Sequence, residues 1–336
     1  HLGKTTLTMR LLVTGATGFI GRTLVLRALA DDAVEEIIAP VRSPDKLRAQ
    51  LAGEGATGMR KLRMIKAAAP AWNLRDLGSV DRVVHCAGVL FGRSRDEYFR
   101  VNVDGTLDLL RQLGDAPEVL VLSSQSAGGP TPEGHPAKKL DHPDRPISWY
   151  GESKLQMERA VREAGHQRVR FLRAPMVLGP GDQATLPLFR MVRGKIWTKP
   201  GRELKHFSWI SSDDLADAIE VWFERGGALD VAHVTSPGTI TDADLMLTAG
   251  KVSARQGKLV SIPQILLKPV AFASKFIPAI GKSVPSLTAD RAREIWPNRW
   301  VLDSDPFHQA TGWRGRATLE DTLARTLSWF QREKLV

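Results

Sequence analysis

A glycine-rich turn between an apolar run and a helical pattern limits what this chain can fold into more than any other feature. The turn is Thr14-Gly-Ala-Thr-Gly-Phe-Ile-Gly21, and the aliphatic run Met9–Val13 precedes it. The residues Phe19–Leu29 carry apolar side chains at the spacing of a helix that packs on a sheet. This order predicts a strand, a tight turn and a helix, which together form the first unit of an α/β fold.

The three glycines of this turn have separate physical roles. Gly15 permits the turn, Gly18 lets the backbone approach a bound group, and Gly21 allows the helix to pack closely on the strand. The N-terminus of the following helix favours negative charge. We therefore expect the turn to bind a dinucleotide pyrophosphate, although ordinary strand–helix turns also use glycine.

Strand and helix patterns alternate beyond the turn. Such alternation predicts an α/β fold with a parallel, doubly wound sheet, and 336 residues suffice for one large domain with a smaller appended lobe. We expect a dinucleotide-binding domain over residues 9–180 and a substrate-binding lobe over residues 181–336, with some segments returning to the main sheet. The expected elements are strands over Glu36–Val41, Arg82–His85, Val119–Leu122 and Arg168–Leu172, and a helix around Asn102–Leu113.

The composition is that of a globular protein and argues against several classes of function. The net charge is +10, but basic and acidic residues are mixed along the chain, so we expect no nucleic-acid partner. The single cysteine, Cys86, can form no internal disulfide and has no partner at metal-ligand spacing, so we expect no metal. No apolar stretch has the length of a membrane span, and no leader pattern precedes Met9. We expect a cytoplasmic protein in which residues 1–8 are an expression remnant.

A second motif places a tyrosine four residues before a lysine in Trp149-Tyr-Gly-Glu-Ser-Lys154. A free tyrosine has a pKa near 10 and is a poor base at neutral pH. If both residues lie on the helix that Gly151–Ala164 predicts, the ammonium of Lys154 is one turn away and favours the phenolate of Tyr150. Such a pair can move a proton while hydride moves to or from a nicotinamide ring.

This set of motifs resembles the extended short-chain dehydrogenase/reductases, the NAD-dependent epimerase/dehydratase family. The resemblance covers nearly the whole chain and implies a Rossmann-like fold with a smaller C-terminal substrate-binding lobe. It also implies hydride transfer between a nicotinamide cofactor and a ketone or secondary alcohol. The matching segments are Thr14–Gly21, His85–Gly88, Asn102–Thr106, Ser123–Ser124, Tyr150 with Lys154, Arg173–Gly181, Asp214–Ala216, Thr311–Trp313 and Leu319–Asp321.

The resemblance implies roles for individual residues. Tyr150 is the expected acid/base, Lys154 its partner, and Ser124 the hydroxyl that holds the reacting oxygen. We prefer Ser124 to Ser123 and Ser126 because in this family the catalytic hydroxyl stands five residues before the glycine that matches Gly129. Asn102 is the expected support of the active-site helix or of a proton relay. The residues expected to bind the cofactor are Gly15, Thr17, Gly18, Phe19, Ile20, Gly21, Arg42, Ala87, Gly88, Ser123, Tyr150, Lys154 and Pro175.

The end of the second expected strand indicates which cofactor is preferred. An acidic residue there would hold the adenosine ribose and exclude a 2′-phosphate. The position is occupied by Val41 and followed by Arg42, while Arg22 flanks the glycine turn. This favours NADP, with NAD as the alternative. We find no acidic residue for the adenine between Arg63 and Asp76.

Two hypotheses about the substrate remain open. The first is a nucleotide-diphosphate sugar, whose diphosphate can be received by the cationic run Arg190–Lys205. Against it, Phe207 stands where enzymes of that kind usually carry an arginine. The second is a lipid-like molecule, for which Ile262–Ile280, with Trp296 and Trp300 beyond, can form an apolar wall.

The favoured function is an NADP-linked reductase or dehydrogenase of a ketone or secondary alcohol. The first alternative is a nucleotide-sugar epimerase or dehydratase, and the second is a non-catalytic dinucleotide-binding sensor. We also expect a small-molecule substrate and a homodimer, because Leu155, Met157 and Val161 can give the helix after Tyr150 an apolar face. The same three side chains can instead serve the core of one chain.

Overall fold

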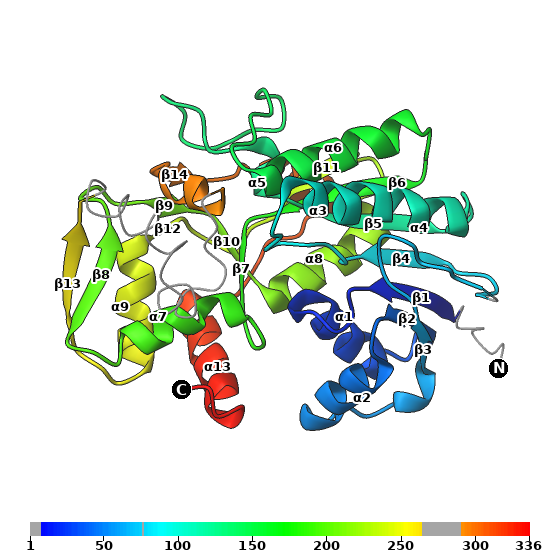
Figure 1. Cartoon of the computed structure of the whole chain (residues 1–336), viewed down its shortest axis with the longest axis horizontal. Helices are drawn as coiled ribbons and strands as arrows, with labels where there is room; N and C mark the ends of the chain where they lie inside the picture. Colours follow the sequence, from blue (N-terminus) through cyan, green and yellow to red (C-terminus); the bar gives the residue numbers. More distant parts are fainter. Residues whose placement is uncertain (1–7, 76, 264–289) are drawn as a thin grey trace. The chain divides into compact units, whose positions relative to one another are not determined.

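The structure, a computed structural model, describes residues 8–75, 77–263 and 290–336. Its contacts divide the chain into two compact units, which can be followed by colour along the sequence in Figure 1. The first unit is His1–Ser123 with Ser153–Leu172, and the second is Ser124–Glu152 with Arg173–Val336. A domain boundary at residue 180 stays a prediction, and residues 1–7 of the expected remnant lie outside the described part of the chain.

The largest sheet has seven strands in the order β11-β6-β5-β4-β1-β2-β3. The pairs β4–β5, β1–β4, β1–β2 and β2–β3 are all parallel. The order reverses between β1 and β4, the switch point at which doubly wound sheets bind their ligands. Its strands are β1 Met9–Thr14, β2 Val34–Val41, β3 Leu62–Lys66, β4 Arg82–His85, β5 Glu118–Ser124, β6 Val169–Ala174 and β11 Val231–His233.

This topology confirms the expected α/β class with a parallel, doubly wound sheet. The central strands have mostly apolar interiors because helices cover both faces, and Leu12, Val13, Ile37 and Ile38 have no exposed surface. The sequence did not reveal β3, whose residues Leu62–Lys66 mix basic and apolar side chains and are half-buried at the edge of the sheet.

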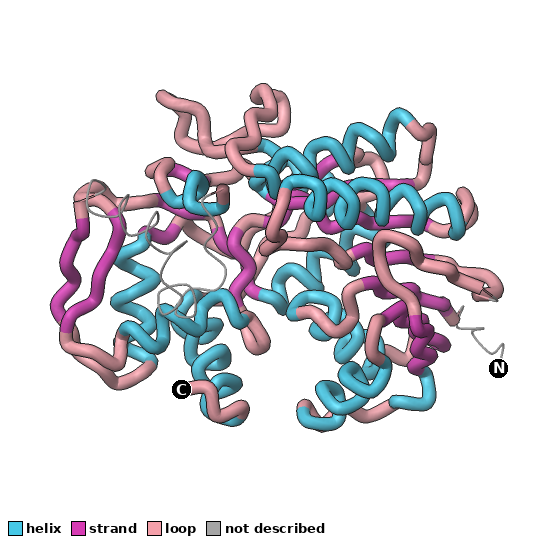
Figure 2. Tube along the Cα trace, in the orientation of Figure 1, coloured by secondary structure: helices cyan, strands magenta, loops and turns pink. Residues whose placement is uncertain are grey.

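The helices of the first unit alternate with its strands, as Figure 2 shows by colour. The helix expected over Asn102–Leu113 begins earlier, at Arg95, because Ser94 caps it by accepting a hydrogen bond from the backbone N–H of Glu97 at 3.2 Å. The helical elements that precede β5 are α1 Phe19–Ala30, α2 Pro44–Gly53, the 3₁₀ turn η1 Met59–Lys61, α3 Arg95–Phe99, the π-helical turn η2 Arg100–Asp104 and α4 Gly105–Leu113.

Helix α6 runs over Trp149–Glu163 and carries Tyr150 in its first turn and Lys154 one turn later. It begins two residues before the expected Gly151. Ser148 explains the difference, because its hydroxyl accepts a hydrogen bond from the backbone N–H of Gly151 at 3.0 Å and so caps the helix start.

The second unit is built from short strands and helices around its own core. Trp197, Trp209, Phe189 and Phe330 are buried together there, and the rings of Phe189 and Phe330 meet edge to face at 5.5 Å. Its elements are α5 Gln125–Gly128, β7 Met176–Leu178, η3 Gln183–Thr185, α7 Leu186–Met191, β8 Ile196–Pro200, β9 His206–Phe207, β10 Trp209–Ser211, α8 Ser212–Arg225, β12 Ile240–Thr241, α9 Asp242–Val252, β13 Lys258–Ile262, η4 Arg291–Ile295, β14 Arg299–Trp300, α12 Asp305–Thr311 and α13 Leu319–Arg332.

Two further observations concern only the described residues. None of their helices has both the length and the apolar character of a membrane span. No group of three or more His, Cys, Asp and Glu side chains among them could hold a metal ion.

Candidate active site

The glycine turn lies between β1 and α1 and packs against the chain just beyond β4. Gly15 has a positive φ of 70°, and a Cβ there would lie 2.8 Å from the backbone nitrogen of Ala87. A Cβ on Gly21 would lie 2.3 Å from the carbonyl oxygen of Gly15, so no side chain fits between turn and helix. Gly18 is the N-cap of α1 and supplies no side chain to cap it. The geometry therefore fits an anionic group bound by backbone N–H groups at this helix end.

A chain of hydrogen bonds joins the turn to α4 through His85. The Thr14 hydroxyl meets Nδ1 of His85 at 2.7 Å, and Nε2 of His85 meets the Thr106 hydroxyl at 2.9 Å. Thr106 donates to the carbonyl of Asn102, so it accepts from His85, whose proton then sits on Nε2. Burial, together with the charge of Lys154, lowers the pKa of His85 to about 3. His85 is thus a neutral structural link, which the sequence did not identify.

Lys154 is buried beside the end of β4. Its ammonium donates to the carbonyl of Leu122 at 2.8 Å. A Cβ on Gly88 would lie 3.5 Å from Nζ of Lys154 and 3.0 Å from Oδ1 of Asn102, so three expected site residues meet here. Burial lowers the pKa of Lys154 to about 8, and electrostatic interactions with Cys86 and Glu158 act against that fall.

Asn102 lies in the π-helical turn η2 and is almost fully buried. Its side-chain amide donates to the carbonyl of Val89 at 3.2 Å and to the Ser153 hydroxyl at 2.9 Å. The side-chain oxygen Oδ1 of Asn102 accepts a hydrogen bond from the backbone N–H of Val89 at 2.8 Å. Asn102 therefore ties η2 to α6 next to Lys154, as a support of that helix would.

Ser123, one of the residues expected to bind cofactor, donates a hydrogen bond from its hydroxyl to Glu158 at 2.5 Å. Both residues are buried, and Glu158 has no exposed surface. Sequence reasoning missed Glu158, although it lies one turn beyond Lys154 on α6 and so continues the stripe that Tyr150 and Lys154 begin.

The second unit contains Ser124 and Tyr150. The Ser124 hydroxyl accepts from the backbone N–H of Ser126 at 3.1 Å and caps α5. A Cβ on Gly151 would lie 2.3 Å from the carbonyl oxygen of Ser126, so the start of α6 lies directly against this segment. Tyr150 is 9% exposed, and the guanidinium of Arg291 lies over its ring at 4.7 Å. Nothing in the sequence signalled this contact, because 141 residues separate the two positions.

The remaining expected residues lie close to these groups in the chain. Ala87 follows β4 in the first unit, and Pro175 is buried between β6 and β7 in the second. Thr17 lies in the glycine turn, while Phe19 and Ile20 form the first turn of α1. Leu155, Met157 and Val161, proposed above as a dimer face, are 6%, 1% and 1% exposed, so the single chain already buries them.

Two arginines bear on cofactor preference. Arg42 is exposed just after β2, where Ser43 caps α2. Arg22 is buried, and its Nε lies 2.6 Å from Glu54, so this guanidinium is already paired. Arg42 is therefore the residue on which the expected preference for NADP depends.

The cationic run Arg190–Lys205 is divided between core and surface. Lys199 is buried and donates to the carbonyls of Gly201 and Glu203 and to Asp242. Lys205 is buried and donates to the carbonyls of Ile295 and Trp296. Both lysines thus make contacts inside the second unit. The exposed cations of the run are Arg190, Arg193, Lys195 and Arg202.

Most of the apolar segment proposed as a pocket wall lies outside the described residues, namely 264–280. Ile262 ends β13, and Trp300 is buried on β14, where its indole N–H donates to the carbonyl of Glu294 at 3.0 Å. Trp300 therefore belongs to the core of the second unit.

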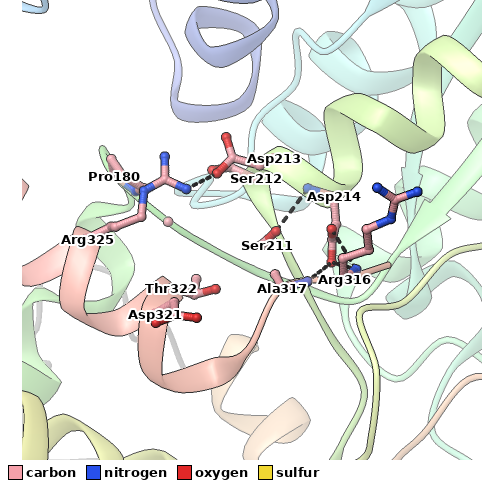
Figure 3. A pocket seen from close by; sticks show the side chains of 11 residues that line it. Pro180, Ser211, Ser212, Asp213, Asp214, Arg316, Ala317, Asp321, Thr322 and Arg325 are labelled. Carbon is pink, nitrogen blue, oxygen red and sulfur yellow. Dashed lines mark hydrogen bonds and ion pairs between the residues drawn. The ribbon is translucent and has the colours of Figure 1, made fainter. Parts of the chain in front are cut away.

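A cavity of about 270 Å³ in the second unit lies where α8 and α13 begin (Figure 3). Asp214 lines it and is buried, but its carboxylate already accepts from Ser236 and from the backbone N–H groups of Arg316 and Ala317. The nearby Arg325 pairs with Asp213. Asp214 thus joins α8 to the segment that precedes α13.

The sequence matches known proteins over nearly its full length. Ceramide reductase of Caulobacter vibrioides is 26% identical over 95% of this chain and 93% of that protein. UDP-glucose 4-epimerase of Azospirillum brasilense is 34% identical over 97% and 93%. The decarboxylating sterol-4-alpha-carboxylate 3-dehydrogenase of Saccharomyces cerevisiae is 26% identical over 74% and 76%.

A comparison with solved structures agrees on the fold. UDP-glucuronic acid 4-epimerase from Bacillus cereus, in complex with UDP-glucuronic acid and NAD, superposes with a TM-score of 0.73 at 18% identity. The match covers 98% of this chain and all of that one. The profile of the NAD dependent epimerase/dehydratase family matches residues 11–233, about two thirds of the chain. The chain therefore belongs to the NAD dependent epimerase/dehydratase family and is an NAD(P)-dependent oxidoreductase of the extended short-chain dehydrogenase/reductase class.

Proposed function

We propose that this enzyme reduces a ketone, or oxidises the corresponding secondary alcohol, with Tyr150 as the acid/base and NADP as an exchangeable cofactor. The observation that carries the proposal is the placement of Tyr150 and Lys154 on consecutive turns of α6, with Lys154 buried. Nicotinamide, when bound, supplies or accepts the hydride. The protein must then move one proton and hold one oxygen.

The proton is moved by Tyr150. In reduction its hydroxyl donates to the oxygen of the carbonyl, and in oxidation its phenolate takes the proton of the alcohol. The ammonium of Lys154 favours the phenolate from one turn away. Ser124 holds the reacting oxygen by donating a hydrogen bond from its hydroxyl. Its partial exposure leaves the hydroxyl accessible, whereas the hydroxyl of Ser123 is already donated to Glu158.

NADP is preferred because Arg42 follows β2 where an acidic residue would exclude a 2′-phosphate. A guanidinium recognises phosphate by charge-assisted hydrogen bonds. Arg22 adds nothing to this preference, since it is paired with Glu54.

A lipid-like ketone is the favoured substrate class. Two similar proteins act, by name, on ceramide and on a sterol carboxylate. The buried lysines of the cationic run are committed to backbone carbonyls, and Phe207 replaces the arginine usual in nucleotide-sugar enzymes. The alternative of a nucleotide-sugar epimerase is supported by the 34% identity to a UDP-glucose 4-epimerase.

Net consumption of NADPH separates these functions. The enzyme is incubated with a panel of lipophilic ketones, including ceramide-like and sterol ketones, and the absorbance of NADPH is followed. We expect stoichiometric oxidation with at least one ketone, and loss of turnover in Tyr150→Phe. Tyr98→Phe is the matched control, because Tyr98 is the only other tyrosine. Turnover of UDP-glucose to its epimer without net change in cofactor would establish the alternative.

A non-catalytic sensor has no need of a proton donor beside the ring. An unchanged cellular phenotype in Tyr150→Phe, together with intact NADPH binding, would favour the sensor over both enzymes.

A further inference from the structure

The ring of Tyr150 is covered by a cation from a distant part of the chain. The guanidinium carbon of Arg291, on η4, lies 4.7 Å from the ring centroid. Both residues belong to the second unit. Tyr150 is 9% exposed and the side chain of Arg291 is 15% exposed, so water screens the contact only in part.

The segment that carries Arg291 is anchored to the start of α6 at two further points. The backbone N–H of Trp149 donates to Asp290 at 2.9 Å. The hydroxyl of Ser148 donates to Glu294. Since these bonds reach the residues directly before Tyr150, they fix η4 against the first turn of α6 and leave Arg291 little freedom to move away.

Other charged side chains lie on the elements that carry Tyr150 and Arg291. Glu294 pairs with Arg291 at 2.6 Å and Asp290 lies beside it on η4, while Glu152 and Lys154 lie on α6 itself. The guanidinium of Arg291 lies over the ring face itself. Glu294 holds that guanidinium in place, and its own charge is partly met by the hydroxyl of Ser148.

A cation over an aromatic face interacts with the electron density of the ring, and this density increases when the phenol loses its proton. The guanidinium is flat and always charged, so it both stacks on the ring and keeps its charge at every working pH. A stacked guanidinium also limits rotation of the ring about its axis. Arg291 is thus placed to act on the orientation and on the ionisation of Tyr150.

We propose that Arg291 is a positioning residue for Tyr150, which holds the phenol ring in one plane and favours its phenolate form. The idea deepens the proposed function, because it names a residue that prepares the acid/base. Its main test does not depend on that function, since ionisation of Tyr150 can be measured without substrate.

The measurement uses the small number of tyrosines in this chain. Tyr98→Phe leaves Tyr150 as the only phenol, so the rise of phenolate absorbance with pH reports Tyr150 alone. Three variants are compared in this background: Arg291→Met, which keeps an apolar stem of similar length; Arg291→Lys, which keeps the charge; and Arg293→Met. Arg293 is the matched control, because it lies on the same turn and is largely exposed.

We expect the midpoint of the phenolate titration to move to higher pH by about one unit in Arg291→Met, a tenfold change in ionisation. Arg291→Lys should return the midpoint most of the way, and Arg293→Met should leave it in place. Circular dichroism and thermal unfolding confirm that each variant is folded. An equal midpoint in the parent and in folded Arg291→Met overturns the proposal, as does an equal shift in Arg293→Met.

Activity provides the second measurement. In Arg291→Met the limb of the pH profile that reports Tyr150 should move with the phenolate midpoint, while KM for NADPH stays unchanged. If no ketone is turned over but the phenolate midpoint shifts, the proposed function fails and the role of Arg291 stands. If ketones are turned over and neither the midpoint nor the profile moves, the role of Arg291 is refuted and the function stands.

Discussion

The hydroxyl of Ser123 donates a hydrogen bond to the carboxylate of Glu158 at 2.5 Å, and both side chains are buried in the first unit. Glu158 lies one turn beyond Lys154 on α6, whose ammonium bonds to the carbonyl of Leu122. The carboxylate therefore sits where its charge stabilises the ammonium of Lys154, while Ser123 satisfies one of its oxygens.

Replacing Glu158 with Gln should lower the pKa of Lys154 below its value of about 8, because a buried negative charge is removed while an oxygen remains to accept from Ser123. Activity needs the ammonium form, so the alkaline limb of kcat should move to lower pH by about one unit. The pH profile of kcat is the measurement. Glu163→Gln, an exposed carboxylate at the end of α6, should change nothing. Coincident profiles for wild type and Glu158→Gln would refute the role of Glu158.

Replacing Arg42 with Ala should weaken NADPH binding by about tenfold to a hundredfold and leave NADH binding unchanged, because only NADPH carries the 2′-phosphate that a guanidinium would bind. Quenching of tryptophan fluorescence gives both dissociation constants. Arg48→Ala is the control, since Arg48 is exposed on α2 and pairs with Asp45. Equal weakening of NADH and NADPH would show that Arg42 does not read the phosphate.

Asp182 offers a test of burial in the second unit. Burial raises its pKa from 3.8 to about 6, against hydrogen bonds from Ala184 and Thr185 that act in the opposite direction. When the pKa of a carboxyl is raised in the folded state, the folded protein loses stability as pH rises from about 4 to 6. Asp182→Asn keeps an acceptor for the backbone N–H of Ala184 and removes the charge. Its free energy of unfolding should therefore exceed that of wild type by up to ~3 kcal/mol at pH 7.5.

The difference in unfolding free energy between Asp182→Asn and wild type should shrink as pH is lowered from about 7 toward 4. The carboxyl of Asp182 then becomes protonated in the folded and in the unfolded wild type. Urea unfolding at several pH values measures it. Asp141→Asn, an exposed carboxylate, is the control. A constant difference at every pH would mean that the gain has another cause.

Gly21 tests the packing of the glycine turn. A Cβ there would lie 2.3 Å from the carbonyl oxygen of Gly15, so Gly21→Ala forces α1 away from the turn. We expect a loss of about 1–3 kcal/mol in unfolding free energy and weaker binding of NADPH and NADH alike. Gly53→Ala is the matched control, because a Cβ at Gly53 meets no atom within 4 Å. Thermal unfolding measures the loss of stability, and fluorescence titration measures the weaker binding. Equal results for Gly21→Ala and Gly53→Ala would contradict the prediction.

The elements that the sequence predicted well are those with local signals. The strand before Gly15, the strand Arg82–His85 and the helix bearing Tyr150 and Lys154 all follow from periodicity and spacing within a few residues. The strand β3 was missed because its mixed residues at a sheet edge lack an apolar pattern.

The relationships that the sequence could not supply are those between distant positions. Ser123 meets Glu158 across 35 residues, and Tyr150 meets Arg291 across a larger gap. Spacing does not encode such contacts, because they form only when segments far apart in the sequence pack together. For the same reason the cationic run Arg190–Lys205 gave no warning that Lys199 and Lys205 point into the protein.

Titration of the purified enzyme with NADPH and with NADH, followed by tryptophan fluorescence, tests the central claim most directly. An oxidoreductase that uses NADP in net turnover must bind and release it. We predict saturable, reversible quenching, with NADPH bound at least about tenfold more tightly than NADH. Tighter binding of NADH, or copurified NAD that resists exchange, would contradict the account and place the nucleotide-sugar epimerase first.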